Sequence, residues 1–372
     1  MDIGPGADGK RRQKRISAST KREWNEKVAR LRVKVLEGSY VERIPQTLEQ
    51  FLDEWLRGIS VAPGTRAIYR RNLLHHVVPR IGGLRLQAID AGMLNQLYAD
   101  LAGAGLGPST IRNQIHAPLA RALKDAVRWG RLARNPAEQA TAPKARAMKE
   151  ARPEMTTWTA SELERFLAAE AETRYGPIWT FLATTGCRRG ECLGLRWSDV
   201  DLDGRRASAT IKQTLTSIEH VPHLAPTTKT GRARRIDLDQ RTVTTLRTWR
   251  SVQAQERLLV GSGYHDTGLM FTLPDGRPYN PEFVAREFTR RAQRHGLRRI
   301  RCHDLRHTWA TLALSAGVDV KIVSERLGHA SSLITLDIYQ HVSPAMASNA
   351  AERVADLIFA GTEGGERGSR TL

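Results

Sequence analysis

The segment TTGCRRGECLGLRWSDVDL, residues 184–202, combines a turn, a short helix and a closely spaced pair of opposite charges. A Thr-Gly pair ends the preceding element, and the apolar residues of RRGECLGLRW then follow helical spacing. Arg188 therefore lies near the start of a helix, where unpaired backbone N–H groups and the helix dipole favour an anion. Glu191 follows three residues later, within reach of the Arg188 side chain. The segment predicts a phosphate-binding arginine oriented by a carboxylate, and a surface ion pair is the competing interpretation.

A second arginine of the same kind lies in HDLRHTWATLAL, residues 303–314, whose apolar residues have helical spacing. His303 and Arg306 are three residues apart and share a helix face. Two guanidinium groups can hold the non-bridging oxygens of one phosphodiester, because each fork binds phosphate bidentately and keeps its charge. The competing interpretation makes His303 and His307 zinc ligands, with Asp304 in place of the usual glutamate. The cation Arg306 between such ligands disfavours a dication, and no third ligand follows at typical spacing.

Three more residues of suitable chemistry lie elsewhere in the C-terminal half of the chain. Lys229 in TTKTGRARRIDL precedes a glycine turn, so its amine can swing toward a leaving oxygen, although a plain phosphate contact is the alternative. His329 follows the helix stop Gly328 in LGHASS and can donate a hydrogen bond to a phosphate oxygen. Tyr339 in ITLDIYQH can attack phosphorus to form a covalent intermediate, although a tyrosine on an amphipathic helix is ordinarily a packing residue.

The ordered set resembles the tyrosine recombinases, also called the phage integrase family. The matching patterns are T-G-x-R-x-x-E, K-T-x-x-x-R ahead of an apolar strand, H-x-x-R, and G-H-x-S followed ten residues later by tyrosine. The resemblance covers roughly residues 45–345 and is strongest at 184–200 and 303–341. It implies that Tyr339 is the nucleophile, and that the other catalytic residues, oriented by the carboxylate of Glu191, are Arg188, Lys229, His303, Arg306 and His329.

The reaction that this resemblance implies needs neither a metal nor a nucleotide. The sequence has no carboxylate cluster for Mg²⁺ and no Walker loop. Fixed cations replace the metal in such a site, and one phosphodiester bond replaces another through a 3′-phosphotyrosyl intermediate. We therefore expect no metal, no other cofactor and no ATP requirement.

The composition favours a nucleic-acid partner. The 372 residues carry 58 Lys plus Arg against 39 Asp plus Glu, a formal charge of +19. Such an excess is typical of proteins that bind a polyanion. The sequence contains no run of about 18 apolar residues and no secretory signal, and its three cysteines form no CxxC pair. We expect a cytoplasmic, nucleoid-associated bacterial protein in which Cys187 and Cys302 are small buried residues.

The chain divides by composition into five parts. Residues 1–44 form a basic strand-then-helix segment that resembles the arm-type DNA-binding module of integrases, either truncated or reduced, with a solvated basic tail as the alternative. Residues 45–140 are amphipathic helices similar to the core-binding domain, 141–158 a linker rich in Pro and Ala, 159–360 the catalytic domain, and 361–372 a disordered tail. The expected fold is mainly α with a small β-sheet, namely a helical, SAM-like core-binding domain and a mixed α/β tyrosine-recombinase catalytic domain.

Local patterns predict several element boundaries. Ser19 or Thr20 is expected to cap the first helix, and the helix in TLEQFLDEWLRG to end at Gly58. In SELERFL, Ser161 and Glu164 are in capping-box register, while ASATIKQTLTS and RARRIDLD are strand-like. The side chains expected to face inward are Trp24, Val28, Leu31 and Val35, then Leu48, Phe51, Leu52 and Trp55, and, ahead of His329, Val320, Ile322, Val323 and Leu327.

The expected function is site-specific integration and excision of a phage or integrative element. Its partners would be double-stranded DNA attachment sites bound by a homo-tetramer, an excisionase and a host DNA-bending protein. A non-cleaving DNA-binding regulator of the same fold is the alternative, and a zinc hydrolase a more distant one. The residues expected to contact the DNA backbone, which carries no sequence information, are Arg11, Arg12, Lys14, Arg15, Arg66, Arg70, Arg71, Arg112, Arg232 and Arg234.

Overall fold

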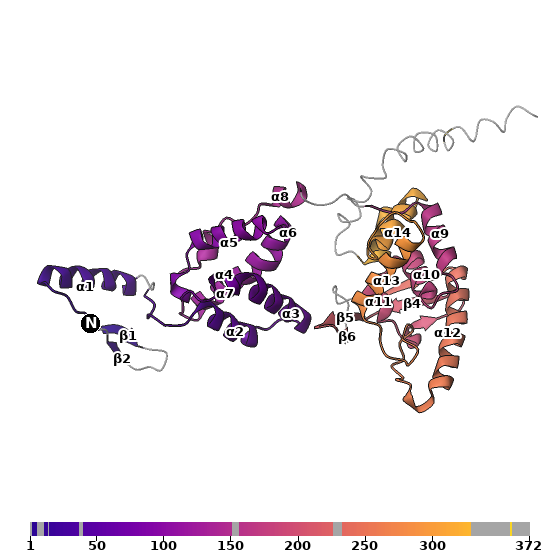
Figure 1. The fold of residues 1–372 in the computed structure, drawn as a ribbon, viewed down its shortest axis with the longest axis horizontal. Coiled ribbons are helices and arrows are strands. Elements are labelled where there is room, and N and C mark those ends of the chain that lie inside the picture. The colour runs from indigo at the N-terminus through magenta and orange to yellow at the C-terminus, as the bar shows by residue number, and fades with distance from the viewer. Residues whose placement is uncertain are drawn as a thin grey trace, which may run out of the picture. The chain divides into compact units, whose positions relative to one another are not determined.

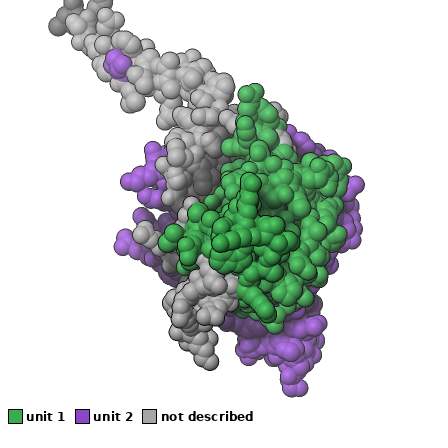
Figure 2. Space-filling view, turned by 90° about the vertical axis from the view of Figure 1, so that its left-hand side faces the viewer, with its two compact units in different colours: residues 1–153 green, residues 154–372 purple. Residues whose placement is uncertain are grey.

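The computed structural model describes residues 2–5, 11–13, 15–36, 40–150, 156–225, 233–328 and 358. Residues 2–5 and 11–13 are described as backbone only. The chain forms two compact units, Met1–Pro153 and Glu154–Leu372 (Figures 1 and 2). Each unit has its own buried apolar cluster. The described elements are mostly helices with a few short antiparallel strands, which confirms the expected fold class.

The first unit begins with a strand pair and a helix. Strand β1 (Asp2–Pro5) pairs antiparallel with β2 (Arg11–Gln13), and α1 (Lys21–Leu36) follows. The helix was predicted. A short strand was predicted at the end of KRRQKRIS, residues 10–17, whereas β2 lies near the start of that stretch, and β1 was not predicted. Thr20 caps α1, because its Oγ1 accepts a hydrogen bond from the Glu23 backbone N–H at 3.2 Å. Val28 is buried as predicted, but Trp24 is 46% exposed and lies outside the apolar cluster of the unit.

The rest of the first unit is a helical bundle around one apolar cluster. Its helices are α2 (Leu48–Gly58), α3 (Pro63–Asn72), α4 (Val78–Ile81), α5 (Ala91–Gly103), α6 (Pro108–Thr110), α7 (Ala117–Arg128) and α8 (Ala145–Glu150). α3 continues into α4, and α6 into α7, through π-helical turns at Leu73–Val77 and Ile111–His116. The inward-facing residues predicted for α2 are all buried, and the helix ends at Gly58 as predicted. Amphipathic spacing therefore determines which face of α2 packs.

The second unit packs its helices around α10 and adds two small sheets. The helices are α9 (Ala160–Glu170), α10 (Gly176–Thr185), α11 (Arg189–Leu193), α12 (Gln240–Val260), α13 (Pro281–Arg294), α14 (Asp304–Ser315) and α15 (Val320–Leu327). α10 contacts α9, α11, α12 and α14 (Figure 1). None of the described helices is long and apolar enough to cross a lipid bilayer.

The strands of the second unit are short and antiparallel. They are β3 (Val200–Asp201), β4 (Ser208–Ile211), β5 (Thr214–Ile218), β6 (Val221–Ala225) and β7 (Arg234–Asp237). β3, β4 and β7 form one sheet in that order, and β5 and β6 form a hairpin. The strand-like stretch ASATIKQTLTS is therefore two strands, because β4 pairs with β7 whereas β5 pairs with β6.

Two local predictions in the second unit are corrected. Thr159, not Ser161, caps α9: its Oγ1 accepts a hydrogen bond from the Glu162 N–H at 3.2 Å, and Glu162 accepts one from the Thr159 N–H at 2.8 Å. Both registers match the capping-box pattern, but the buried Trp158 precedes the earlier one at the position of a hydrophobic staple. In α15, Ile322 is 57% exposed, whereas the other predicted inward residues are buried or half-buried.

A close approach at Gly186 brings the end of α10 against α14 and α15. Gly186 ends α10 in the left-handed conformation, with φ of 64°. A Cβ at this position would come within 2.8 Å of the Leu327 and Trp309 side chains, so a residue with a side chain does not fit there. Because Arg188 follows this turn and Arg306 lies on α14, the turn brings the two expected phosphate-binding segments together.

Candidate active site

Arg188 and Glu191 form a pair at the start of α11. The Glu191 carboxylate accepts hydrogen bonds from the Arg188 backbone N–H at 2.9 Å and from its Nη1 at 2.8 Å. Glu191 is only 2% exposed. Burial raises the pKa of this carboxyl, but hydrogen bonds and charges from Arg234 and Arg188 outweigh burial and hold the pKa below its usual value. Glu191 is therefore ionised at neutral pH and fixes the direction of Arg188.

Arg234 on β7 is the second partner of Glu191. Its Nη1 and Nη2 donate to the two carboxylate oxygens at 3.0 and 2.5 Å, a bidentate arrangement. Its side chain is 12% exposed, and its Nε donates to the Arg326 carbonyl at 3.0 Å. From the sequence, Arg234 is predicted to contact the DNA backbone. The structure places its guanidinium beside Glu191, within the cluster that contains Arg188.

Arg306 is buried on α14, with 3% exposure. Its Nη1 donates to the Gly186 carbonyl at 2.9 Å, and its Nη2 donates to the Leu327 carbonyl at 2.7 Å. Burial, with repulsion from Arg188, lowers the pKa of Arg306 to about 10, so the group stays charged at neutral pH. Two carbonyls thus hold a cation whose remaining N–H groups are available for an anion.

The C-terminal end of α15 gathers three arginines. The carbonyls of residues 326, 327 and 328 accept hydrogen bonds from Arg234, Arg306 and Arg188 in turn, the last at 3.3 Å. A helix C-terminus carries partial negative charge and unpaired carbonyls, so it stabilises these cations. The cluster of Arg188, Glu191, Arg234 and Arg306 therefore lies at the point where the chain leaves α15 toward His329.

His303 precedes α14, at its N-cap position, and is exposed. Its ring lies edge-on to that of His307, with centroids 5.4 Å apart. Partial desolvation, together with His307 and Arg306, lowers the pKa of His303, so its ring is neutral at pH 7. In the zinc alternative, Asp304 takes the place of the usual glutamate. Its carboxylate instead accepts a hydrogen bond from the Arg301 Nη2 at 2.8 Å. Within the described ranges, no group of three His, Cys, Asp or Glu side chains is arranged to hold a metal.

The remaining catalytic candidates, Lys229, His329 and Tyr339, lie outside the described residues, as do Lys14 and Arg232. Arg11 and Arg12 are described as backbone only. Of the other residues expected to contact DNA, Arg112 is half-buried and donates to the Pro143 carbonyl at 2.8 Å. The exposed ones are Arg15, Arg66, Arg70 and Arg71.

The contacts that Arg234 and Arg326 make were not predicted from the sequence. Strand alternation carried a signal for the first, because Arg234 shares a strand face with Ile236, which is 1% exposed, whereas Arg235 points the other way. Arg326 lies over the Trp309 ring at 5.1 Å and donates to the Asp237 carbonyl at 3.0 Å. No pattern in the sequence marked that contact, which joins α15 to the end of β7.

Known proteins are similar to this chain in sequence or in fold. The tyrosine recombinase XerC-like protein of Caldanaerobacter subterraneus subsp. tengcongensis is 27% identical over 380 residues, covering 96% of this chain and 95% of that protein. The Tn1549 transposon integrase, solved in complex with transposon right end DNA, matches with a TM-score of 0.67 and 18% identity over 83% of this chain and 100% of that one. Lambda integrase, solved as a tetramer bound to a Holliday junction, matches with a TM-score of 0.60 and 17% identity over 91% of each chain.

The family comparison falls within the second unit. The model of the phage integrase family matches residues 157–346, which include Arg188, Glu191, His303, Arg306 and Tyr339. Because this match spans more than half of the chain, and the tyrosine recombinases of this family cut and rejoin DNA, the chain belongs to the phage integrase family and is a site-specific tyrosine recombinase.

Proposed function

We propose that this recombinase integrates and excises a mobile DNA element, of the phage or integrative-element type, by cutting each strand with Tyr339. The observation that carries the proposal is the convergence of Arg188 and Arg306 on one helix end, where Glu191 and backbone carbonyls fix both guanidiniums. Two fixed cations suit the non-bridging oxygens of a single phosphodiester.

In the proposed cleavage step, the Tyr339 oxygen bonds to the scissile phosphorus as the bond from phosphorus to the 5′ oxygen breaks. His303, whose pKa is lowered, is neutral at pH 7 and can accept the tyrosine proton. Lys229 donates a proton to the leaving 5′ oxygen, and His329 donates a hydrogen bond to a non-bridging oxygen. The products are a 3′-phosphotyrosyl bond and a free 5′ hydroxyl, and the reverse reaction with a new 5′ hydroxyl rejoins DNA.

Arg188 and Arg306 supply most of the transition-state stabilisation in this proposal. Negative charge grows on the phosphoryl oxygens as phosphorus becomes five-coordinate, and cations already in place need no reorganisation to neutralise it. Glu191 and Arg234 act through Arg188, because the carboxylate directs its guanidinium and Arg234 keeps the carboxylate ionised. One phosphodiester replaces another, so the proposed step uses no ATP and no metal.

The proposed partners are double-stranded DNA attachment sites and three further copies of the chain. Support comes from the similar integrases, which were solved with transposon end DNA and as a tetramer on a Holliday junction. An excisionase, a host DNA-bending protein and a location at the bacterial nucleoid complete the proposal. A non-cleaving regulator is not favoured, because the buried Arg306 and Glu191 would then be retained at an energetic cost without a reaction to serve.

A covalent adduct tests the proposal. The wild-type protein, mixed with a nicked core-site DNA that traps cleavage, is expected to form a protein–DNA adduct that survives denaturing detergent. Tyr339→Phe is expected to bind the same DNA and form none. Tyr264→Phe, which removes a hydroxyl outside the proposed site, serves as the control and should react like wild type. Adduct formation by Tyr339→Phe would refute the nucleophile assignment.

A further inference from the structure

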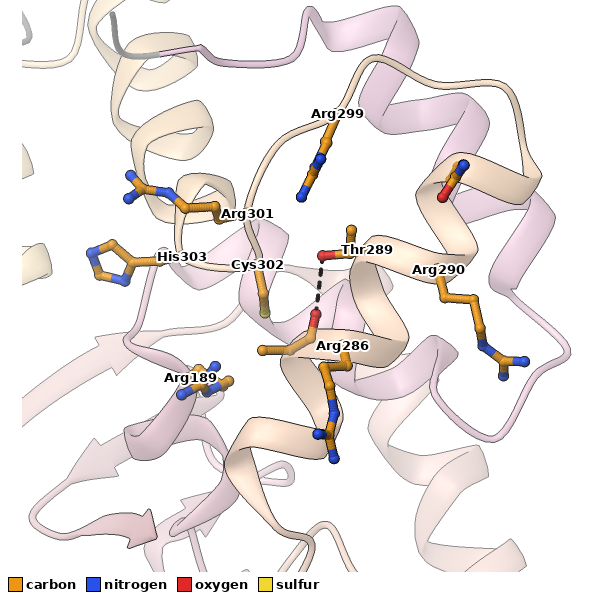
Figure 3. A pocket seen from close by; sticks show the side chains of 10 residues that line it. Arg189, Arg286, Thr289, Arg290, Arg299, Arg301, Cys302 and His303 are labelled. Atoms are coloured by element: carbon orange, nitrogen blue, oxygen red, sulfur yellow. Dashed lines mark hydrogen bonds between the residues drawn. The ribbon is translucent and has the colours of Figure 1, made fainter. Parts of the chain in front are cut away.

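A basic pocket of about 610 Å³ lies beside the candidate active site in the second unit (Figure 3). Small side chains line it at Ala285 and Thr289 on α13 and at Cys302 in the segment that leads into α14. The other lining residues are Arg189, Arg286, Arg290, Gln293, Arg299, Arg301 and His303. The lining thus contains five arginines and no carboxylate.

Two of the five arginines that line this pocket form ion pairs with carboxylates. Arg290 pairs with Glu287 at 2.6 Å, and Arg301 pairs with Asp304 at 2.8 Å. Figure 3 shows both of these side chains pointing away from the pocket centre, whereas Arg299 points toward it. Arg189, Arg286 and Arg299 have no ion pair or side-chain hydrogen bond among the described residues. Three like charges around one concavity repel one another unless an anion occupies it.

A buried donor also lacks a partner here. The Nε of Arg189 is buried, and within the described part of the chain it donates to no acceptor. Buried N–H donors in native proteins are mostly paired, and a phosphate oxygen would supply the acceptor that the Arg189 Nε lacks. The three arginines supply many N–H donors at one opening, which suits the oxygens of phosphate groups.

The pocket lies next to the two proposed phosphate-binding arginines, which favours phosphates of the same DNA strand as its ligands. Arg189 follows Arg188 directly in the sequence, and His303, which lines the pocket, lies one helical turn from Arg306. A DNA strand carries one phosphate per about 3.4 Å of helix axis, so a strand held at the two catalytic arginines brings further phosphates to adjacent protein surface. The pocket contains no Phe, Tyr or Trp on which a base could stack, which favours the backbone over a nucleobase.

We propose that Arg189, Arg286 and Arg299 form a phosphate-binding pocket for the backbone of the DNA strand that is cut, next to its scissile phosphate. This inference rests on the proposed function. It adds the place on the protein at which the DNA backbone next to the scissile phosphate is held. These three arginines anchor the strand without taking part in the chemical step, so their loss weakens DNA binding.

Salt dependence of DNA binding tests the pocket. We expect the double variant R286A/R299A to bind a core half-site with a slope of log affinity against log salt that is smaller by about two, since each lost phosphate contact removes about 0.9. The matched control is Arg294→Ala, an exposed arginine on the same helix that does not line the pocket. An unchanged slope in the double variant, with its melting temperature preserved, would overturn the proposal.

Neutral methylphosphonates locate the contact. Replacing single phosphates on each side of the scissile position should weaken wild-type binding at one or two flanking positions, and R286A/R299A should lose no further affinity at those positions. Equal losses of DNA affinity in the wild-type protein and in R286A/R299A would contradict the proposal. Tighter binding of a polyglutamate peptide than of DNA by the wild-type protein would also contradict it. Failure of the larger proposal is distinguishable, because the wild-type protein would then form no covalent adduct on any half-site.

Discussion

The two compact units differ in what they bury. In the first unit, the buried polar residues among those described are Asn72 and Asn135, and the rest of the interior is apolar. In the second unit, the described buried charged residues are Glu170, Glu191, Asp199, Glu287, Asp304 and Arg306. Burying a charge costs free energy unless it is paired and hydrogen-bonded. The interior of the first unit is therefore almost entirely apolar among the described residues, whereas the second retains buried charges that its chemistry or its packing uses.

Buried charge alone does not mark the active site. Glu170 accepts hydrogen bonds from Arg291 at 2.6 Å and Thr173 at 2.9 Å, and it pairs with His295 at 2.7 Å, so both oxygens of its carboxylate are paired within the protein. Glu191 also has two arginine partners, but one of them, Arg188, is a proposed phosphate ligand. The two clusters therefore differ in the proposed role of one cation, Arg188, and not in how far their carboxylates are paired.

The largest expected stability effect is at Glu170. Glu170→Ala leaves the half-buried Arg291 and His295 without their shared carboxylate, and we expect the second unit to lose about 3–5 kcal/mol of unfolding free energy. Hydrogen exchange of α10 amides under mild denaturant measures the change. The control Glu172→Ala alters an exposed residue two positions away. A loss below about 1 kcal/mol would mean that the buried charges do not distinguish the two units energetically.

Arg234→Ala should affect the reaction more than the fold. Glu191 would keep Arg188 but lose its bidentate partner, so Arg188 would be held less firmly, and we expect cleavage to fall about 10- to 100-fold, or about 1.4–2.8 kcal/mol. Arg235→Ala is the matched control, because the Arg235 side chain is 60% exposed and lies on the opposite face of the strand. Arg234→Lys should recover part of the rate. Single-turnover adduct formation at saturating DNA provides the measurement. Equal rates for the Arg234 and Arg235 variants would show that Arg234 does not position the site.

The two units should differ in their stability at low pH. The pKa values of Glu170 and Glu191 are lowered in the folded protein, so both carboxylates stabilise the second unit above their unfolded-state pKa of about 4.3. That contribution is lost as pH falls below this value, through the lowered folded-state pKa. We expect α10 amides to lose exchange protection at a higher pH than α7 amides. Loss of protection in both helices at one pH would contradict the comparison.

The smallest effects are expected at two matched helix caps. Thr47 with Gln50, and Thr159 with Glu162, form capping boxes of the same kind in the first and second units. Thr47→Ala and Thr159→Ala should each cost about 1 kcal/mol, since each removes one side-chain acceptor at a helix N-terminus. Denaturant midpoints of the two units measure both changes. A difference above about 1 kcal/mol between them would show that local capping, and not only buried charge, differs between the units.

Features that depend on neighbours along the chain were predictable from sequence. The packed face of α2, the Gly328 stop of α15 and the Arg188–Glu191 pair follow from helical spacing within a few residues. Contacts between distant segments were not predictable, such as Arg234 with Glu191, 43 residues apart, and Arg188 with the Gly328 carbonyl, 140 residues apart. They depend on how α11, β7 and α15 pack together, which residue spacing alone does not specify.

The central claim is that the fixed charge of Arg306, together with Arg188, neutralises charge that grows on the scissile phosphate. The most direct measurement compares single-turnover cleavage of a normal core site with that of a site whose scissile phosphate is a neutral methylphosphonate. We predict that Arg306→Ala slows cleavage of the normal site by about 10²–10³-fold, as expected for loss of a transition-state donor, and slows the neutral site less than about tenfold. Equal slowing on both substrates would show that Arg306 acts only through the structure of the site and would contradict the claim.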